Sequence, residues 1–338
     1  MIYSNRTHAY IPGILLTLLP AILYGCSHNV LPEEVAFLKE RSCSLTKFSY
    51  YNSRSEGSTL DILTFENDIF KRLDSYKRIE RFNGMTAVAE STGGEKIFFF
   101  CLNGQRTRYE WADIQSYNSL QKIRCDLEKE GHTKHTMTGE CCTEAGGSDG
   151  TSVEFTPLIS MIRLESISCD FSGTAYADKK INNIKVYLTN VNATYPLVCN
   201  EAQHAERIIN AGMLNESDLK RFNNPDIICR TIDTDINNTT VAPDIDLLCY
   251  PNVCTEDTPG TPYTRLVIEG KIDSIKYYWP ITINIEGKGV TRNTLYSYDI
   301  RIRRKGTSDP ELTIDPTDID IKLNIRSWKE KTAYDVTF

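Results

Sequence analysis

Short apolar segments separated by turn residues are the feature that most constrains the fold of this chain. In residues 319–325, Ile and Leu alternate with Asp320, Lys322 and Asn324, the pattern of an antiparallel strand with one buried face. Further segments rich in β-branched and aromatic residues, each bounded by Gly, Asn, Asp or Ser, lie at 60–65, 96–102, 184–188 and 265–272. Such segments are typical of strands, so the sequence predicts an all-β sandwich architecture.

Two departures from this pattern refine the prediction. Residues 277–285 also alternate but contain Pro280, which cannot donate a backbone hydrogen bond and therefore predicts an edge strand or a bulge. Apolar residues at near-helical spacing occur at 113–129 and 201–222, the second interrupted near its middle by Asn, Ala and Gly. We therefore expect a mostly-β chain with a few short helices.

A glycine-rich polar segment at 146–150, followed by Pro157, divides the chain into two parts. We predict an N-terminal β-sandwich domain at 26–156 and a C-terminal β-sandwich domain at 157–338. These hold about 130 and about 180 residues, which are ordinary domain sizes. Residues 1–25 are left out of the first domain because they have the composition of an export leader.

The leader contains Arg6 and then an apolar run from 11 to 23 that Pro and Gly interrupt. A membrane-spanning helix needs about 20 apolar residues, so this run is typical of a signal peptide instead. The run ends in Leu-Tyr-Gly followed by Cys26, which resembles a bacterial lipoprotein box and predicts that Cys26 is lipidated. An ordinary cleaved signal with an incidental cysteine is the alternative, and both interpretations export the protein.

Charge and cysteine usage fit an exported protein. The net charge of −7 becomes −8 without the leader, because Arg6 is the only charged residue of the leader. The chain has no basic patch, so nucleic acid is not expected as a partner.

Ten cysteines remain besides Cys26, an even number that fits disulfides in an oxidising compartment. Cys249 and Cys254 are the best candidate pair because Pro251 and Asn252 between them favour a turn. The other pairings stay open, and buried thiols in strands are the alternative.

No pattern predicts catalysis or a bound metal. His132 and His135, followed by Cys141 and Cys142, form the most metal-like group, but their spacing matches no structural zinc class. The sequence has no nucleophile elbow, phosphate loop or His-Glu-x-x-His motif. We therefore expect no enzyme activity, no catalytic residue, no metal and no cofactor.

The order of these segments resembles the Bacteroidetes fimbrillins, the type V pilins. The segments that carry the resemblance are, in chain order, 44–52, 60–67, 95–104, the helical region around Leu120, 137–139, 161–167, 183–190, 277–281, 291–296 and 319–328. The resemblance implies two transthyretin-like β-sandwich domains and a lipoprotein precursor at the outer membrane and cell surface. It also implies a structural subunit of a surface fimbria, with other fimbrial subunits as partners and a role in adhesion. The high cysteine count departs from these pilins and leaves the kind of subunit, shaft, anchor or tip, open.

The resemblance places a protease cut between Arg54 and Ser55. Residues 52–58 are polar and lie between two strand signals, as preferred sites of nicking do, although an ordinary solvated Arg is the alternative. The cut would release the first strand and Cys43 with it. If Cys43 is bonded into the first domain instead, the strand stays tethered, as would suit an uncut subunit.

The last residues have the pattern of a donor strand that joins one subunit to the next. Tyr334, Val336 and Phe338 fall on one face of an extended chain, and Asp335 and Thr337 fall on the other. An apolar groove in a neighbouring subunit would accept such a strand. The alternative is an edge strand that completes the chain's own domain.

Two other classes of protein remain open from the sequence. One is a lipid-anchored glycan-binding protein of the outer membrane, which would present exposed aromatic residues to sugars. Trp111, Trp279 and Trp328 are scattered through unlike segments, so core packing is the better interpretation of them. The other is a β-sandwich hydrolase, for which no site is found in the sequence, because nothing singles out a pair among its many carboxylates.

Overall fold

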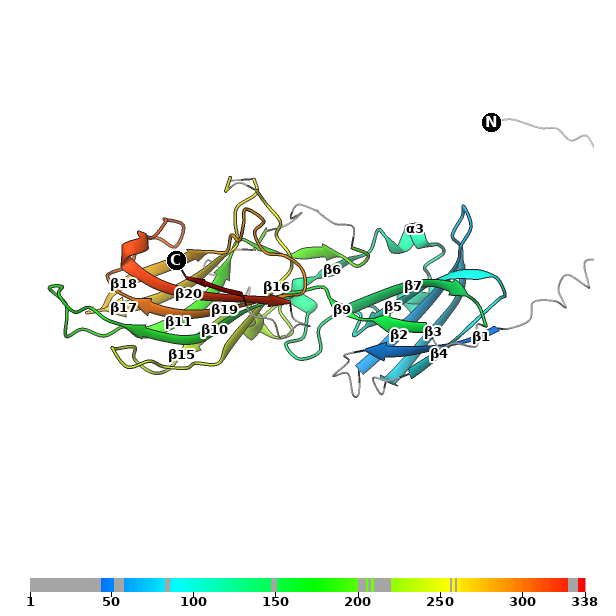
Figure 1. Cartoon of the computed structure of the whole chain (residues 1–338), viewed down its shortest axis with the longest axis horizontal. Helices are drawn as coiled ribbons and strands as arrows, with labels where there is room; N and C mark the ends of the chain where they lie inside the picture. Colours follow the sequence, from blue (N-terminus) through cyan, green and yellow to red (C-terminus); the bar gives the residue numbers. More distant parts are fainter. Residues whose placement is uncertain are drawn as a thin grey trace, which may run out of the picture. The chain divides into compact units, whose positions relative to one another are not determined.

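The computed structural model describes residues 44–51, 58–82, 86–146, 151–199, 205, 208–209, 220–255, 257–258, 260–327 and 334–337. Contacts gather Cys43–Phe338 into one compact unit. Strands dominate the described residues (Figure 1), and the all-β sandwich fold predicted from the sequence is confirmed. Among the helices that are described, none is long and apolar enough to span a membrane.

Residues up to 157 form two sheets. One sheet has the order β4-β1-β8 and the other has the order β3-β2-β5-β7-β9. The three strands of the first are β1 (Ser44–Tyr51), β4 (Thr86–Ser91) and β8 (Thr151–Glu154). The five strands of the second are β2 (Ser58–Glu66), β3 (Leu73–Phe82), β5 (Glu95–Leu102), β7 (Met137–Glu144) and β9 (Thr156–Pro157).

The central strands β2 and β5 are buried on both faces, which explains their nearly continuous apolar sequences. Leu60 and Ile62 of β2 belong to one buried cluster, whereas Leu63 and Phe65 belong to another. Because successive side chains of a strand point to opposite faces, the first cluster lies on the face toward the β4-β1-β8 sheet. The second cluster lies on the opposite face, which also contacts the helices.

Two short helices pack on that opposite face. α2 (Arg108–Ala112) begins with a capping box between Thr107 and Glu110, and α3 (Tyr117–Leu120) is capped by the Ser116 hydroxyl. The helix predicted over 113–129 is therefore wrong in extent. After α3 the chain forms β6 (Arg124–Asp126) and η1 (Leu127–Lys129), because β6 pairs with β13 far along the chain, and this tertiary pairing overrides the helical spacing.

The residues after 157 form two larger sheets. One has the order β16-β10-β19-β20-β21, and the other has the order β15-β11-β17-β18. The strands of the first are β10 (Ser160–Cys169), β16 (Ile245–Cys249), β19 (Thr294–Ile302), β20 (Ile319–Ser327) and β21 (Tyr334–Thr337). The strands of the second are β11 (Asn182–Thr189), β15 (Cys229–Ile232), β17 (Arg265–Ile272) and β18 (Ile275–Thr282).

The shorter elements complete this part. They are β12 (Val191–Asn192), β13 (Thr194–Pro196), β14 (Ile208–Ile209), η3 (Pro225–Ile227) and η4 (Pro316–Asp318). β18 is an edge strand, so the expectation set by Pro280 is confirmed. The helix predicted at 201–222 falls mostly outside the described residues, and within it Ile208 and Ile209 pair with β12 as a strand.

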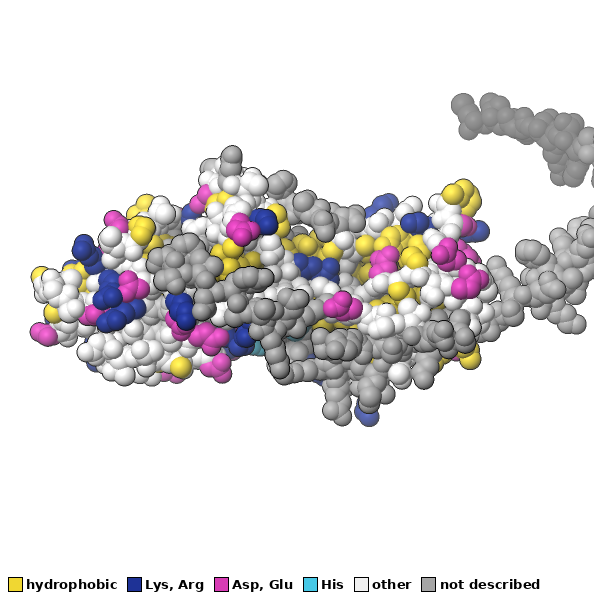
Figure 2. Space-filling model, viewed as in Figure 1, with side chains coloured by type: hydrophobic (Ala, Val, Ile, Leu, Met, Phe, Trp, Pro, Cys, Tyr) yellow, Lys and Arg dark blue, Asp and Glu magenta, His cyan; other side chains and the backbone are white. Residues whose placement is uncertain are grey.

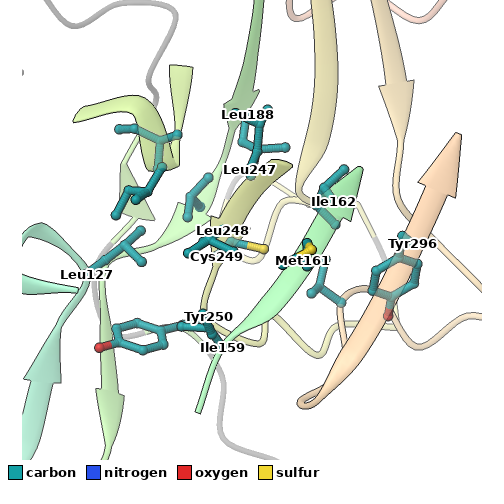
Figure 3. Close-up of a cluster of buried hydrophobic side chains, with 14 of the residues drawn as sticks. Leu127, Ile159, Met161, Ile162, Leu188, Leu247, Leu248, Cys249, Tyr250 and Tyr296 are labelled. Atoms are coloured by element: carbon teal, nitrogen blue, oxygen red, sulfur yellow. The ribbon is translucent and has the colours of Figure 1, made fainter. Parts of the chain in front are cut away.

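Direct contacts join the parts before and after 157 within this unit. The buried Glu130 carboxylate accepts hydrogen bonds from the Tyr250 hydroxyl (2.7 Å), the Gln105 amide (2.9 Å) and the Thr136 backbone N–H (2.8 Å). Burial raises the pKa of Glu130. Arg292 donates to the carbonyl oxygens of Thr156 and Pro157. Figure 3 shows side chains from both parts, such as Leu127 and Tyr250, in one buried cluster. The predicted domain boundary stays a prediction.

Candidate functional site

The candidate site is the place that β1 occupies in its sheet. β1 is the inner strand, antiparallel to β4 from Ser44↔Ser91 to Ser49↔Thr86 and parallel to β8 from Phe48↔Thr151 to Tyr51↔Glu154. Figure 1 shows β1 beside β4, and β1 is joined to β2 by residues 52–57. Removal of β1 would leave unpaired backbone donors and acceptors on β4 and β8, facing each other across a gap one strand wide.

An apolar floor lies beneath this position. It consists of side chains of which none is more than 4% exposed: Leu60, Ile62, Phe82, Ala87, Ala89, Phe98, Phe100, Leu102, Val153 and Phe155. The rings of Phe100 and Phe155 meet edge to face with centroids 6.5 Å apart, within the range of about 4.5–7 Å that is typical of aromatic pairs. A strand placed between β4 and β8 therefore covers a surface made almost wholly of hydrocarbon.

Gly139 sets how closely β8 can approach the second sheet. A Cβ at this position of β7 would lie 2.8 Å from the Glu154 carbonyl oxygen and 2.8 Å from a Val153 methyl group. Real Cβ atoms do not approach backbone oxygens so closely, so the position requires glycine. The sequence offered a signal for this contact, since glycine inside a strand marks a bulge or a close backbone approach.

The other face of the same floor strands carries a buried carboxylate. Asp61 is 0% exposed, and it accepts a hydrogen bond from the Tyr76 hydroxyl at 2.8 Å. The Arg78 Nε atom lies 3.6 Å from its Oδ1. Burial outweighs both contacts and raises the pKa of Asp61 to about 6. Asp61 is thus a buried hydrogen-bond acceptor within β2.

Several of the predicted site residues lie outside the described residues. These are Cys26, Cys43, Arg54, Ser55 and Phe338. The described strands bracket the predicted cut, since β1 ends at Tyr51 and β2 begins at Ser58. The lipidation and the cut stay predictions.

The described part of the tail forms β21. Tyr334 pairs with Ile325 and Val336 pairs with Leu323 of the chain's own β20. β21 is the edge of its sheet, the arrangement given above as the alternative to a donor strand. Its role in a neighbouring subunit stays a prediction.

The predicted disulfide between Cys249 and Cys254 is not formed in the structure. Both thiols are free and buried. The residues between them do not make the expected turn, because Tyr250 forms a bridge with Asn192 and Asn252 forms a bridge with Val290. All nine cysteines in the described part of the chain are free, and five of them are buried. The disulfide pairings stay predictions.

The groups considered for metal or sugar binding have structural places. The His132 ring lies 3.2 Å from the Asp246 carbonyl oxygen, and the described residues contain no group of three His, Cys, Asp or Glu side chains that could hold a metal. Trp111 and Trp279 are 0% exposed, so neither can stack on a sugar. Trp328 lies outside the described residues.

Comparisons with known proteins agree with this architecture at the level of structure. No family model and no curated protein matches the sequence. A fimbrilin (FimA) from Porphyromonas gingivalis matches with a TM-score of 0.59 at 13% identity, over 84% of this chain and 97% of its own. The chain has the fold of a fimbrilin. The same fold occurs in a protein of Parabacteroides distasonis provisionally named for cell adhesion, with a TM-score of 0.61 at 15% identity, over 87% of this chain and 99% of its own.

A third match extends the fold to another kind of fimbrial protein. The tip fimbrial protein of P. gingivalis, solved with a C-terminal truncation, has a TM-score of 0.52 at 13% identity, over 84% of this chain and 98% of its own. At these identities the likeness concerns the fold. The sequence prediction of a fimbrillin-like architecture is confirmed to that extent.

Proposed function

We propose that this chain is a structural subunit of a surface fimbria that supports adhesion. In this proposal it is exported as a lipoprotein through Cys26, cut between Arg54 and Ser55, and polymerised by donor-strand exchange with other fimbrial subunits. The observation that carries the proposal is the position of β1 (Ser44–Tyr51), an inner strand over an apolar floor. Its connection to β2 contains the predicted cut.

The physical argument begins with what a cut would change. Once residues 52–57 are cleaved, backbone hydrogen bonds and apolar burial alone hold β1 against β4 and β8. A strand from another molecule can make the same ladder bonds, since these do not depend on sequence, and can cover the same floor. Each large apolar side chain that it buries contributes about 1.5–3 kcal/mol.

The C-terminal tail is the proposed donor. Tyr334, Val336 and Phe338 alternate with polar residues, and the ten residues after Trp328 reach at most about 35 Å when extended. In the single chain this tail is an edge strand with four residue pairs to β20. An edge strand is hydrogen-bonded to a single neighbouring strand, so its release breaks fewer backbone hydrogen bonds than the release of an inner strand would.

Deleting Ala333 to Phe338 tests the donor role. A donor strand predicts folded monomers that do not polymerise, whereas a strand that completes its own domain predicts destabilised monomers. Unboiled gels report the polymers, and urea denaturation reports the stability. Intact ladders of polymers from the truncated protein would rule out the donor role.

Replacing Arg54 by Ala tests the cut. N-terminal sequencing of the assembled wild-type protein should begin at Ser55, and the variant should keep β1 and fail to accept a donor. Arg81→Ala is the matched control, because Arg81 is exposed near the end of β3. A wild-type protein that begins at Cys26 would indicate the alternative, an uncut anchor or tip subunit, and mass spectrometry of Cys43 would show whether a disulfide tethers the strand.

A non-enzymatic role at the cell surface follows from the same proposal. The precursor would be anchored in the outer membrane by its lipid, and the ligand that it adheres to is not identified. The glycan-binding alternative is disfavoured by the burial of Trp111 and Trp279. Labelling with palmitate in a host that processes lipoproteins, with Cys26→Ser as the control, tests the anchor directly.

A further inference from the structure

The floor beneath β1 changes from polar to apolar along its length. At one end, the side chains of Thr64 and Ser91 are 0% and 5% exposed, and neither hydroxyl has a hydrogen-bond partner among the described residues. The buried Lys96 ammonium at this end donates to the Glu66 carboxylate (2.5 Å) and to the Thr92 hydroxyl (2.7 Å). A buried polar group costs free energy unless it is hydrogen-bonded, so this end favours a strand that brings a polar side chain.

The register of β1 shows which of its ends lies over the polar part of the floor. Ser44, at the start of β1, pairs with Ser91, whereas Tyr50, near its end, pairs with Val153 of the apolar cluster. Because side chains alternate along a strand and Leu45 is 60% exposed, positions 44, 46, 48 and 50 fall on the floor face. These positions hold Ser, Thr, Phe and Tyr in that order. The sequence of β1 therefore becomes apolar in the same direction as the floor.

The proposed donor has the same order of side chains. The residues of the tail that share one face are Thr332, Tyr334, Val336 and Phe338. In the direction of β1, this series puts Thr332 beside Ser91 and Phe338 beside Val153. The reverse direction would put a phenylalanine over the two buried hydroxyls and leave the threonine over hydrocarbon.

Charge favours the same direction. Figure 2 shows Asp and Glu side chains gathered at the end of the sheets where β1 begins in Figure 1, at the right of the view. The exposed Glu95 and Glu144 pair with each other at this end, and a Cβ at Gly146 would lie 3.3 Å from the Cβ of Ser44. A donor in the direction of β1 passes this acidic end with residues 329–331, which are Lys, Glu and Lys. Their net positive charge complements it.

We propose that the donor strand of a second copy of this chain enters the place of β1 in the direction of β1, with Thr332 beside Ser91. Val336 then lies opposite Ala87, which pairs with Phe48 in the single chain. The inference rests on the proposed donor-strand exchange and deepens it, because it gives the donor a direction and a register. The unpartnered hydroxyl of Ser91 selects a donor with a hydroxyl at the first position of the floor.

Engineered disulfides test the direction and the register. Val336→Cys is combined in one full-length chain with Ala87→Cys or, as the matched control, with Ala89→Cys. Directly opposite residues of antiparallel strands have Cβ atoms about 4.5–5.5 Å apart, which is close to the span of a disulfide. Assembled polymers are treated with diamide and boiled in detergent without reductant, and mass spectrometry identifies the linked peptides. We expect linked ladders with Ala87→Cys and none with Ala89→Cys.

Two results of this experiment would overturn the inference. Linkage to Ala89→Cys instead would do so, because the reverse direction and a shift of two residues toward Ser91 both place Val336 there. Ladders that neither cysteine pair links would also do so. If the wild-type protein forms no ladders on unboiled gels, donor-strand exchange itself is refuted, and the inference falls with it.

A second measurement tests the role of the hydroxyl. Thr332→Val and Thr337→Val make the same chemical change on opposite faces of the donor. Loss of the hydrogen bond to Ser91 should make the Thr332→Val polymers dissociate roughly two- to tenfold faster on heating, and Thr337→Val should leave the rate unchanged. In acceptors with Ser91→Ala, the Thr332→Val donor should dissociate no faster than the wild-type donor. Equal dissociation rates of the two valine variants would overturn the assignment of Thr332 to Ser91.

Discussion

Replacing Asp61 by Asn should remove part of the pH dependence of the free energy of unfolding. Asp61 is fully buried in β2, and burial raises its pKa from 3.8 to about 6. A carboxyl group with a raised pKa stabilises the folded state fully below pH 3.8, and this contribution is lost as the pH rises through about 6. One pKa unit corresponds to about 1.4 kcal/mol, so the loss in the wild type amounts to about 3 kcal/mol.

Asparagine is neutral at every pH and can still accept the hydrogen bond from Tyr76. The free energy of unfolding of Asp61→Asn, relative to the wild type, should therefore rise by about 3 kcal/mol between pH 3.5 and pH 7. Urea denaturation at a series of pH values measures this difference, in which the other titrating groups cancel. Asp233→Asn, which removes an exposed carboxylate, is the control. A difference that stays constant over this range would refute the argument that burial keeps Asp61 neutral.

Three further changes test the packing around the candidate site. Gly139→Ala should lower the free energy of unfolding by about 1–3 kcal/mol, because its Cβ would overlap the backbone of β8. Gly93→Ala is the control and should leave the free energy of unfolding unchanged, since a Cβ there would have nothing within 4 Å. Equal free energies for the two variants in urea denaturation would contradict the close approach at Gly139. Phe100→Ala should cost about 3–5 kcal/mol through the cavity left in the floor, and a smaller loss in calorimetry would mean that the floor collapses around it. Tyr250→Phe should cost about 1–3 kcal/mol because it removes a donor to the buried Glu130, and unchanged thermal unfolding would show that another donor replaces the hydroxyl.

The strands that could be predicted from the sequence are those whose burial leaves a local pattern. The apolar runs at 60–65 and 96–102 became β2 and β5 because both faces of these strands are covered. Pro280 marked β18 as an edge strand, since proline has no backbone N–H to donate to a neighbouring strand on an inner position of a sheet. The alternation at 319–325 became β20, which β19 and β21 flank.

Two of the failures share a physical cause, which is pairing with residues far along the chain. The helical spacing at 113–129 gave way to β6 because Cys125 pairs with Tyr195. The turn expected between Cys249 and Cys254 gave way to bridges from Tyr250 and Asn252. Local sequence carries no information about such partners. β4 was missed for a different reason, because its buried residues are two alanines and a serine, and alanine is depleted in strands.

The position of β1 as the first of the described strands has a kinetic consequence. While residues 52–57 are intact, they hold β1 beside β4 and β8 at an effective concentration of roughly millimolar, as short linkers do. A free strand of another molecule at lower concentration cannot displace it. One cleavage in this connection removes that advantage, whereas a strand in the middle of the chain would need two. The six residues from 52 to 57 can therefore separate the time of folding from the time at which the sheet becomes open to exchange.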